Sequence, residues 1–429
     1  MMLIGVNNLI EEKMKKVNKY ILYGYLIYIA FIICYFYVFT NPSIPVSLKG
    51  TVMDPATFMN KKQLEISTSY STIKNVIYFI SLPFDWFVFW WIISSRFAKR
   101  TGERLEKLTK FRSIQILLFF FFVSISTYLV TYPVDVIRFF LSKHYQINTQ
   151  SFLGWMRDQV IDFWVNFIIM YLVVYVVLFL MKKQPKRWWF SVWLLSIPFT
   201  VFLTFIQPVV IDPLYNQFYP LKDKALENEI MTLAHKANIP AKRVYEVDMS
   251  TKTTTYNAYV TGIGNNARIV LWDTTLNGLK DDEILFIMAH EMSHYIHKDI
   301  YTSMFGGIAG SLIGLYLIDW LIRKVYKNRN AYEKITMVHL TLFLLFSSLL
   351  SFAATPIENA ISRHAEKVAD LYAVKLTKDP EAGVTAFQKL TKNSLTQVNP
   401  PGLVKFFLYD HPTMLERITY IENAVPKKK

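Results

Sequence analysis

Seven long apolar runs dominate this 429-residue sequence and limit the folds that it can adopt. A helix needs about 20 predominantly apolar residues to cross the hydrocarbon core of a membrane. The runs of this kind are Tyr20–Phe39, Val76–Ile93, Ile114–Val134, Phe163–Met181, Trp188–Val210, Ser303–Ile322 and Ile335–Ala353. Only 18% of the residues are charged, whereas a soluble domain carries about a quarter. The sequence therefore predicts an α-helical, multi-pass integral membrane protein with seven transmembrane helices, rather than a large soluble helical core.

The net charge of +15 does not indicate nucleic-acid binding, because most basic residues lie in short clusters between the apolar runs. The clusters richest in basic residues are Lys13–Lys19, Arg96–Arg112, Lys182–Arg187 and Arg323–Lys334. All four fall on one side of the predicted membrane, and the positive-inside rule makes that side cytoplasmic. The first run is too long for a signal-peptide core and is interpreted as a retained anchor. The single cysteine, Cys34, allows no intramolecular disulfide.

Four polar residues lie within the apolar runs or near their ends: Asp85, Asp135, Asp319 and His339. Charged side chains inside a membrane are energetically unfavourable, so each is a candidate functional residue. Asp135 and Asp319 are expected at the membrane–water interface. Asp85 lies close to Pro83 and is expected to face an interior lined by protein or water, which an assembly of helices around an aqueous chamber would provide.

Residues 211–302, between the fifth and sixth runs, have the pattern of a small α+β domain. A helical period covers Ala225–Ala237, and short β-rich runs follow at Arg243–Val247 and Arg268–Trp272. If the runs cross the membrane as predicted, the basic clusters place this segment and the C-terminal one outside the cytoplasm.

Residues 354–429 are expected to form helices near Glu358–Lys375, at Pro380–Leu390 and after His411, followed by a solvated end at Lys427–Lys429. The predicted organisation is a membrane domain with spans 1–5 at 1–210, a first soluble part at 211–302, spans 6 and 7 at 303–353, and a second soluble part at 354–429.

The segment His290-Glu291-Met292-Ser293-His294 carries the strongest chemical signal. It continues a helix-compatible stretch whose acidic start suits a helix N-terminus. Residues four apart on a helix project from the same face, so both imidazoles can bind one zinc ion. Glu291 follows the first of them, where its carboxylate can reach a zinc-activated water without binding the metal. Two unrelated exposed histidines are the alternative, although a chain with eight histidines seldom matches this motif by chance.

A catalytic zinc needs a third protein ligand and an open position for water. The stretch Ser362–Asp370 contains Glu366 and Asp370, four residues apart and so on one helical face. Glu366 could bind the metal, while Asp370 could orient a ligand imidazole through a hydrogen bond. An ordinary charged helix face has the same spacing, so the spacing alone leaves both interpretations open.

The two motifs together resemble those of the integral-membrane CAAX prenyl endopeptidases of type I, a gluzincin family. That family has H-E-x-x-H, two further spans and then S-R-x-x-E-x-x-A-D, as in His290–His294 and Ser362–Asp370. Other matching segments are Pro133, Asn148-Thr149, Trp155, Pro213–Leu221, Asn257-Ala258-Tyr259 with Gly262, Arg268–Thr274, His411-Pro412 and Glu416-Arg417. The likeness runs from about Tyr132 to the end, and residues before about Arg112 share only the presence of spans.

The resemblance implies a hollow barrel of seven transmembrane helices, capped by a small α+β zinc-metalloprotease domain. It implies one zinc ion per chain, with Glu366 as the ligand that joins His290 and His294. By the same resemblance, Glu291 is the general base and Asp370 supports a ligand.

The resemblance also assigns residues to the substrate. His411 and Arg417 fall where donors near the developing oxyanion stabilise a tetrahedral intermediate, although a surface or capping histidine is the alternative for His411. Asn257-Ala258-Tyr259 resembles an edge strand that an extended substrate peptide joins through backbone pairing. A plain hairpin strand would be compatible with the same residues.

The sequence thus predicts a membrane zinc metalloendopeptidase that hydrolyses membrane-associated or lipidated polypeptides, including CAAX-prenyl-like ones. Nothing in the chain specifies a prenyl group, so a quality-control protease for damaged membrane proteins remains an alternative. A non-catalytic chamber with structural zinc is disfavoured, because such a site has no need of Glu291. The expected partners are a peptide or protein substrate and membrane lipid, with no nucleic acid and an undetermined oligomeric state. Eukaryotic members of the family act towards the cytosol, which leaves the side of the catalytic domain open.

Overall fold

The computed structural model describes residues 2–41, 43–240, 243–261, 268–327 and 331–424. Gly262 of the predicted edge-strand segment and the predicted solvated end Lys427–Lys429 lie outside the described residues. The helices of four or more residues, apart from short π-helical turns, are α1 Met2–Cys34, α2 Pro55–Phe58, α3 Lys61–Ser81, α4 Phe84–Ser94, α5 Phe97–Leu108, α6 Arg112–His144, α7 Phe152–Lys183, α8 Trp188–Ile206, α9 Lys224–Lys236, α10 Asp273–Gly278, α11 Asp281–Ile296, α12 Asp299–Val325, α13 Met337–Thr377, α14 Pro380–Asn393, α15 Gly402–Leu408 and α16 Met414–Ala424.

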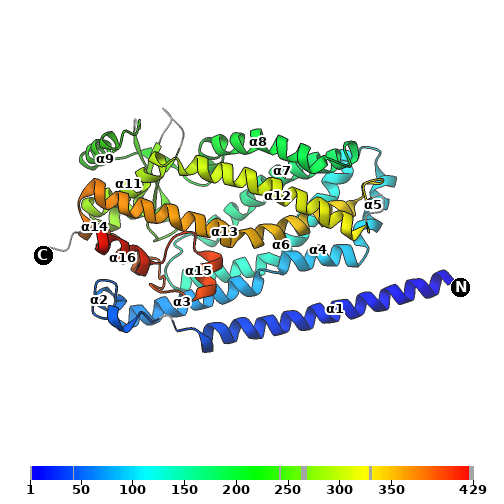
Figure 1. Ribbon diagram of the computed structural model, residues 1–429, viewed down its shortest axis with the longest axis horizontal. Coiled ribbons are helices and arrows are strands. Elements are labelled where there is room, and N and C mark those ends of the chain that lie inside the picture. The colour runs from blue at the N-terminus through cyan, green and yellow to red at the C-terminus, as the bar shows by residue number, and fades with distance from the viewer. Residues whose placement is uncertain (1, 42, 241–242, 262–267, 328–330, 425–429) are drawn as a thin grey trace.

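Long apolar helices form most of the molecule and run along its longest axis (Figure 1). Within the described residues, six segments are long and apolar enough to cross a membrane: Val17–Phe39, Lys61–Ser94, Arg112–His144, Phe152–Lys183, Asp299–Val325 and Met337–Thr377. The remaining predicted run forms α8, whose apolar stretch Trp188–Thr204 is shorter than these. The predicted multi-pass membrane fold is therefore confirmed, while the number of seven spans stays a prediction.

A proline divides the second predicted span into two helices. Pro83 lies between α3 and α4. The helix is interrupted there because proline has no backbone N–H to donate within a continuous helix. Asp85 consequently sits in the first turn of α4, and it lines a cavity of about 470 Å³ between α4, α6, α7 and α13, whose wall contains both polar and apolar side chains. Asp135 lines the same cavity and pairs with Arg138 at 3.1 Å. The interior position expected for Asp85 thus also holds for Asp135, which had been expected at the interface.

Asp319 is also buried inside the protein rather than placed at an exposed interface. Its Oδ1 accepts hydrogen bonds from Trp188 Nε1 and the Tyr332 hydroxyl, each at 2.6 Å. Its Oδ2 accepts from Arg323 Nε at 2.7 Å. A buried carboxylate is tolerated when such donors replace its water shell. These contacts connect α8, α12 and the segment before α13, so Asp319 ties three parts of the helical assembly together.

The soluble part between α8 and α12 contains a four-stranded sheet. Its strands are β1 Phe218–Pro220, β2 Val244–Val247, β3 Ala258–Thr261 and β4 Arg268–Trp272, in the order β1-β2-β4-β3. The β2–β4 pair is parallel and the other two pairs are antiparallel. One face of the sheet, which includes the paired residues Ala258 and Leu271, packs with α9 and α11 in one apolar core. This core also includes residues of α14 and α16. Since β3 lies at the end of the order, one of its edges is unpaired within the described sheet.

Helix α13 joins the membrane part to the soluble part without interruption. It is 41 residues long, and the predicted domain boundary at 353 and 354 lies inside it. Pro356 removes only one backbone donor, and the helix contains no glycine that would favour a stop. The helix ends where Lys378 adopts a left-handed conformation, with φ of 57°. A single rigid element therefore carries both the last predicted span and Glu366.

Candidate metal centre and active site

Helix α11 carries the paired histidines and is stabilised from its first turn. The Lys280 backbone N–H donates to Glu283 Oε2 at 2.7 Å, and acidic residues fill the first turn, where they complement the helix dipole. The helix packs against β3 on one side and α13 on another. Gly383 of α14 also lies against it, because a Cβ there would fall 2.4 Å from the Phe286 ring. This close packing buries His290 and leaves His294 half-buried.

Helix α13 brings Glu366 to the two imidazoles. Glu366 Oε2 lies 3.1 Å from His290 Nε2, and Oε1 lies 3.3 Å from His294 Nε2. The two Nε2 atoms are themselves 3.3 Å apart. Seventy-six residues of sequence separate His290 from Glu366, yet one ligand atom from each of the three side chains forms a compact triangle, with the three atoms within 4.8 Å of one another.

The triangle fits a divalent metal ion. Tetrahedral ligands at about 2.0–2.1 Å from zinc lie roughly 3.3 Å from one another, and the nearest ligand atoms of each pair of these side chains are 3.1 to 3.3 Å apart. Glu366 Oε2 is buried and accepts no hydrogen bond from the described residues. A buried carboxylate oxygen without a donor is unfavourable unless a cation occupies the space it faces. Among the described residues, His290, His294 and Glu366 are the group that could hold such an ion.

Two carboxylates fix the imidazoles in orientations suited to binding through Nε2. Asp370 Oδ1 lies 2.9 Å from His290 Nδ1, and Asp299 Oδ2 lies 2.8 Å from His294 Nδ1. A proton on each Nδ1 would leave Nε2 free for the metal. Asp370 could be predicted from the sequence, whereas Asp299 was not among the predicted residues. The available signal was an acidic residue five positions after the second histidine, but only the turn through Lys298, with φ of 59°, brings it back towards His294.

Glu291 lies next to the triangle without being part of it. It is half-buried, and burial raises the pKa of its carboxyl while the neighbouring His290 and His294 oppose the increase. Nearby Glu366 raises the pKa further. A carboxylate with an elevated pKa is suited to accept a proton near neutral pH.

His411 and Arg417 approach the same site from the C-terminal segment. His411 is half-exposed, with Nε2 3.4 Å from Glu366 Oε1 and Nδ1 2.7 Å from Asp410. Arg417 is buried and donates from Nε and Nη2 to Asp370 at 3.0 and 2.6 Å. Its guanidinium carbon lies 4.0 Å from the centre of the Phe387 ring. His411 thus faces the metal triangle, whereas Arg417 mainly holds Asp370.

The segment Asn257-Ala258-Tyr259 leads into the edge strand β3. Trp272 N–H donates to the Asn257 carbonyl at 3.1 Å, and the β3–β4 pairing continues as Ala258 opposite Leu271. Hydrogen-bonding pairs alternate along antiparallel strands, so the backbone groups of Ala258 and Val260 point to the unpaired edge. Ala258 N–H bonds the side chain of Asn257 there, at 2.8 Å. Helix α11, which carries the two-histidine motif, packs against this same strand.

Comparison with known proteins decides the family. A model described as the CAAX prenyl protease N-terminal region, with five membrane helices, matches residues 37–217. The model of peptidase family M48 matches residues 220–425. A Bacillus subtilis protein named uncharacterized metalloprotease YhfN is 48% identical over 408 residues, covering 94% of this chain and 95% of that protein. The chain belongs to peptidase family M48.

Other relatives of this M48 protein include eukaryotic enzymes. CAAX prenyl protease 1 from Saccharomyces cerevisiae is 30% identical over 334 residues, which cover 71% of this chain and 71% of that protein. The crystal structure of Ste24p from S. mikatae has the same fold, with a TM-score of 0.79 and 23% identity. That match covers 94% of this chain and 97% of the other.

Membership in M48 confirms the predicted membrane metalloprotease and the family resemblance. The likeness begins earlier than the motifs indicated, at residue 37 rather than near Tyr132. The residues of the early helices match a family model without a short chemical motif, which is why motif reading alone did not detect them.

The Asp299 contact leads to a prediction for this M48 site. Replacing Asp299 with asparagine should lower metal affinity about 10- to 100-fold, because His294 loses the carboxylate that orients its ring. Competition with a chelator of known affinity measures the change in the purified protein. Asp281→Asn, at the exposed start of α11, is the matched control and should bind metal as the unaltered chain does. Equal affinities for both variants would remove Asp299 from the metal site.

Proposed function

We propose that this M48 protein is a zinc endopeptidase that cleaves membrane-associated or lipidated polypeptides, with one zinc ion per chain. The observation that carries the proposal is the triangle of His290, His294 and Glu366 with Glu291 beside it. Two imidazoles and one carboxylate are a donor set of catalytic zinc sites. Calcium and magnesium prefer all-oxygen ligands, so the paired imidazoles favour zinc.

The residues around the triangle suit hydrolysis of a peptide bond. A zinc ion held there would polarise a substrate carbonyl and make a water molecule more acidic. Glu291 would accept the proton of that water during attack on the carbonyl and deliver it to the leaving amine. His411 Nε2, which faces the site, would donate a hydrogen bond to the oxygen of the tetrahedral intermediate.

Asp370 and Arg417 would act through the ligand His290. Asp370 bonds His290 Nδ1, and Arg417 donates twice to Asp370, so the pair would keep the imidazole in one orientation. This arrangement favours a positioning role for Arg417 over the oxyanion contact implied by the family resemblance, because two of its nitrogens are already committed to Asp370.

The unpaired edge of β3 would bind the substrate backbone. An extended peptide could pair with Ala258 and Val260, whose backbone groups point to that edge. Backbone pairing reads no side chain, so sequence preference would come from the surroundings of the strand. Asn257 would compete for one donor of this edge, because its side chain already accepts from Ala258 N–H.

Metal removal is the direct test of zinc chemistry. Treating the purified protein in detergent with 1,10-phenanthroline should abolish hydrolysis of a membrane-associated peptide, and added zinc should restore it. Hydrolysis that survives complete removal of the metal, measured together with zinc content, would contradict the proposal. A structural chamber that uses zinc without catalysis would show no hydrolysis in either state.

The lipid part of the substrate is tested separately. A farnesylated peptide should be cleaved with kcat/KM at least about tenfold above its unprenylated twin, because the apolar helices can bury hydrocarbon. Relatives named CAAX prenyl protease 1 motivate this choice. Equal cleavage of both peptides would favour the alternative, a quality-control protease for damaged membrane proteins.

A further inference from the structure

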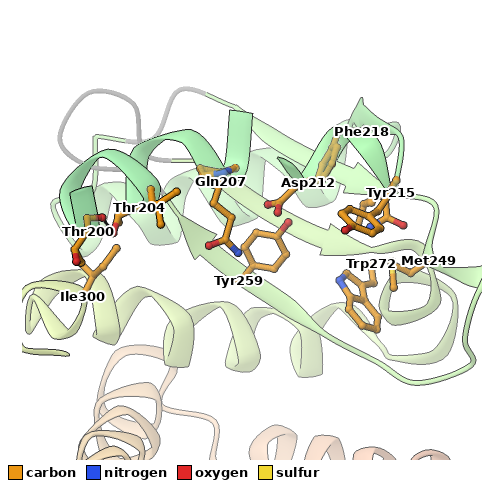
Figure 2. A pocket seen from close by; sticks show the side chains of 14 residues that line it. Thr200, Thr204, Gln207, Asp212, Tyr215, Phe218, Met249, Tyr259, Trp272 and Ile300 are labelled. Carbon is orange, nitrogen blue, oxygen red and sulfur yellow. Dashed lines mark hydrogen bonds between the residues drawn. The ribbon is translucent and has the colours of Figure 1, made fainter. Parts of the chain in front are cut away.

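A second cavity lies between the sheet and the end of α8, on the sheet face opposite the α11 core. It has a volume of about 590 Å³ and is lined by residues of α8, β1–β4, the start of α12 and the short helical turns Gln207–Ile211 and Asp212–Leu214. Figure 2 shows the side chains of Gln207, Asp212 and Tyr259 converging there, with Trp272 further along the sheet. None of the roles proposed above uses this cavity.

Asp212 is the one charged residue that lines the cavity among the described residues. Its carboxylate has no hydrogen-bond or ion-pair partner within the part of the chain that the structure describes. Partial burial raises the pKa of this carboxyl above its usual value. The nearby cation Lys252 is committed elsewhere, with Nζ 2.6 Å from Asp158 and 2.8 Å from the Tyr215 carbonyl. The cavity therefore presents a negative charge that no described cation balances.

Aromatic rings form much of the remaining wall. Tyr215, Phe218, Tyr259 and Trp272 all line the cavity. Burial, together with the negative charge of Asp212, raises the pKa of Tyr259 to about 12, so the phenol stays neutral. Aromatic faces attract cations, and a carboxylate binds them through charge-assisted hydrogen bonds. A wall of rings around one carboxylate is thus complementary to a positive group on an apolar stem.

Strand β3 links this cavity to the proposed substrate path. Tyr259 points into the cavity from β3, whereas Ala258 points to the α11 core. A peptide added to the unpaired edge would place the residue opposite Tyr259 on the same face as Tyr259. That side chain would enter the cavity mouth. Lysine and arginine can lay their methylene stems along the rings while the charge reaches Asp212.

We propose that the cavity containing Asp212 is a subsite for a lysine or arginine side chain of the substrate peptide. The inference rests on the proposed endopeptidase function, and it adds that recognition of the substrate includes one basic residue. Its position along the peptide is the one whose side chain faces Tyr259 when the peptide pairs with β3.

The test uses the full-length protein with zinc in detergent and one peptide that it cleaves in a Glu291-dependent manner. Peptides that differ only by lysine, glutamine or glutamate are compared at each position around the cleaved bond. We expect one position where lysine exceeds glutamate in kcat/KM by about 10- to 100-fold, as for a hydrogen bond to a charged group. Asp212→Asn should reduce this ratio to within about twofold, and Asp212→Lys should invert it.

Controls separate a local subsite from a general charge effect. Asp212→Glu should retain the preference for lysine, and Glu229→Lys, on the exposed face of α9, should leave the ratio as in the unaltered chain. Binding of fluorescent lysine and glutamate peptides to the Glu291→Gln protein gives the same ratio without turnover and without any change at Asp212.

The outcomes distinguish the two proposals. A chain that cleaves the neutral peptide but shows no charge preference, or one whose preference survives Asp212→Asn, overturns the subsite and leaves the endopeptidase intact. Failure to cleave any peptide of the panel, with zinc bound, instead contradicts the endopeptidase function on which the subsite rests.

Discussion

Glu291→Gln is expected to lower the turnover of a cleavable peptide by roughly 10²- to 10⁴-fold, the usual contribution of a general base. Glutamine has nearly the same shape as glutamate but cannot accept the proton. Glu291 lies outside the triangle of ligand atoms, so the variant should retain close to one zinc ion per chain. The pairing of lost turnover with retained metal is what identifies a base rather than a ligand.

The measurement combines kcat with zinc content in the same preparation. Glu229→Gln, a change of the same type on the exposed surface of α9, is the matched control and should keep both values. Undiminished turnover in Glu291→Gln would exclude the general-base role. Loss of zinc together with turnover would instead indicate that Glu291 supports the metal site.

Glu366→Ala is expected to lose both metal and activity. Four-ligand zinc sites gain about 10–16 kcal/mol on binding, so one protein ligand contributes roughly 3 kcal/mol, or at least about 100-fold in affinity. The variant also leaves the space between His290 and His294 without its carboxylate. Zinc content after dialysis against a moderate chelator should therefore fall well below one per chain.

Glu358→Ala provides the comparison on the same helix, because Glu358 is exposed and precedes Glu366 by about two turns of α13. It should retain zinc and peptide hydrolysis. Stoichiometric zinc in Glu366→Ala under the same dialysis would remove this residue from the ligand set. The proposed metal centre would then need another third ligand.

Local spacing along single helices could be predicted from the sequence. His290, Glu291 and His294 occupy one turn of α11, and Glu366 and Asp370 occupy one turn of α13. Their mutual placement depends only on 3.6 residues per turn, which any α-helix imposes. The apolar runs were equally readable, because crossing a membrane requires a length of apolar helix that few soluble segments have.

Long-range contacts had to come from the tertiary structure or from the family resemblance. The spacing of Glu366 and Asp370 suited an ordinary charged surface as well, and only the packing of α13 against α11 brings Glu366 within 3.1 Å of His290. The continuity of α13 through the expected boundary was likewise not apparent, because Pro356 and the change of polarity both resembled an end. Contacts between distant segments follow from packing, which sequence spacing does not encode.

The sequence by itself determined a multi-pass helical membrane chain with a two-histidine metal motif, since periodicity and apolar length act within one segment. The tertiary structure alone decided that Asp299 supports His294, that Arg417 holds Asp370, and that Asp212 faces aromatic rings across a cavity. Each of these depends on where a turn or a neighbouring element places a side chain. That placement is the collective result of packing the whole chain, and no local pattern specifies it.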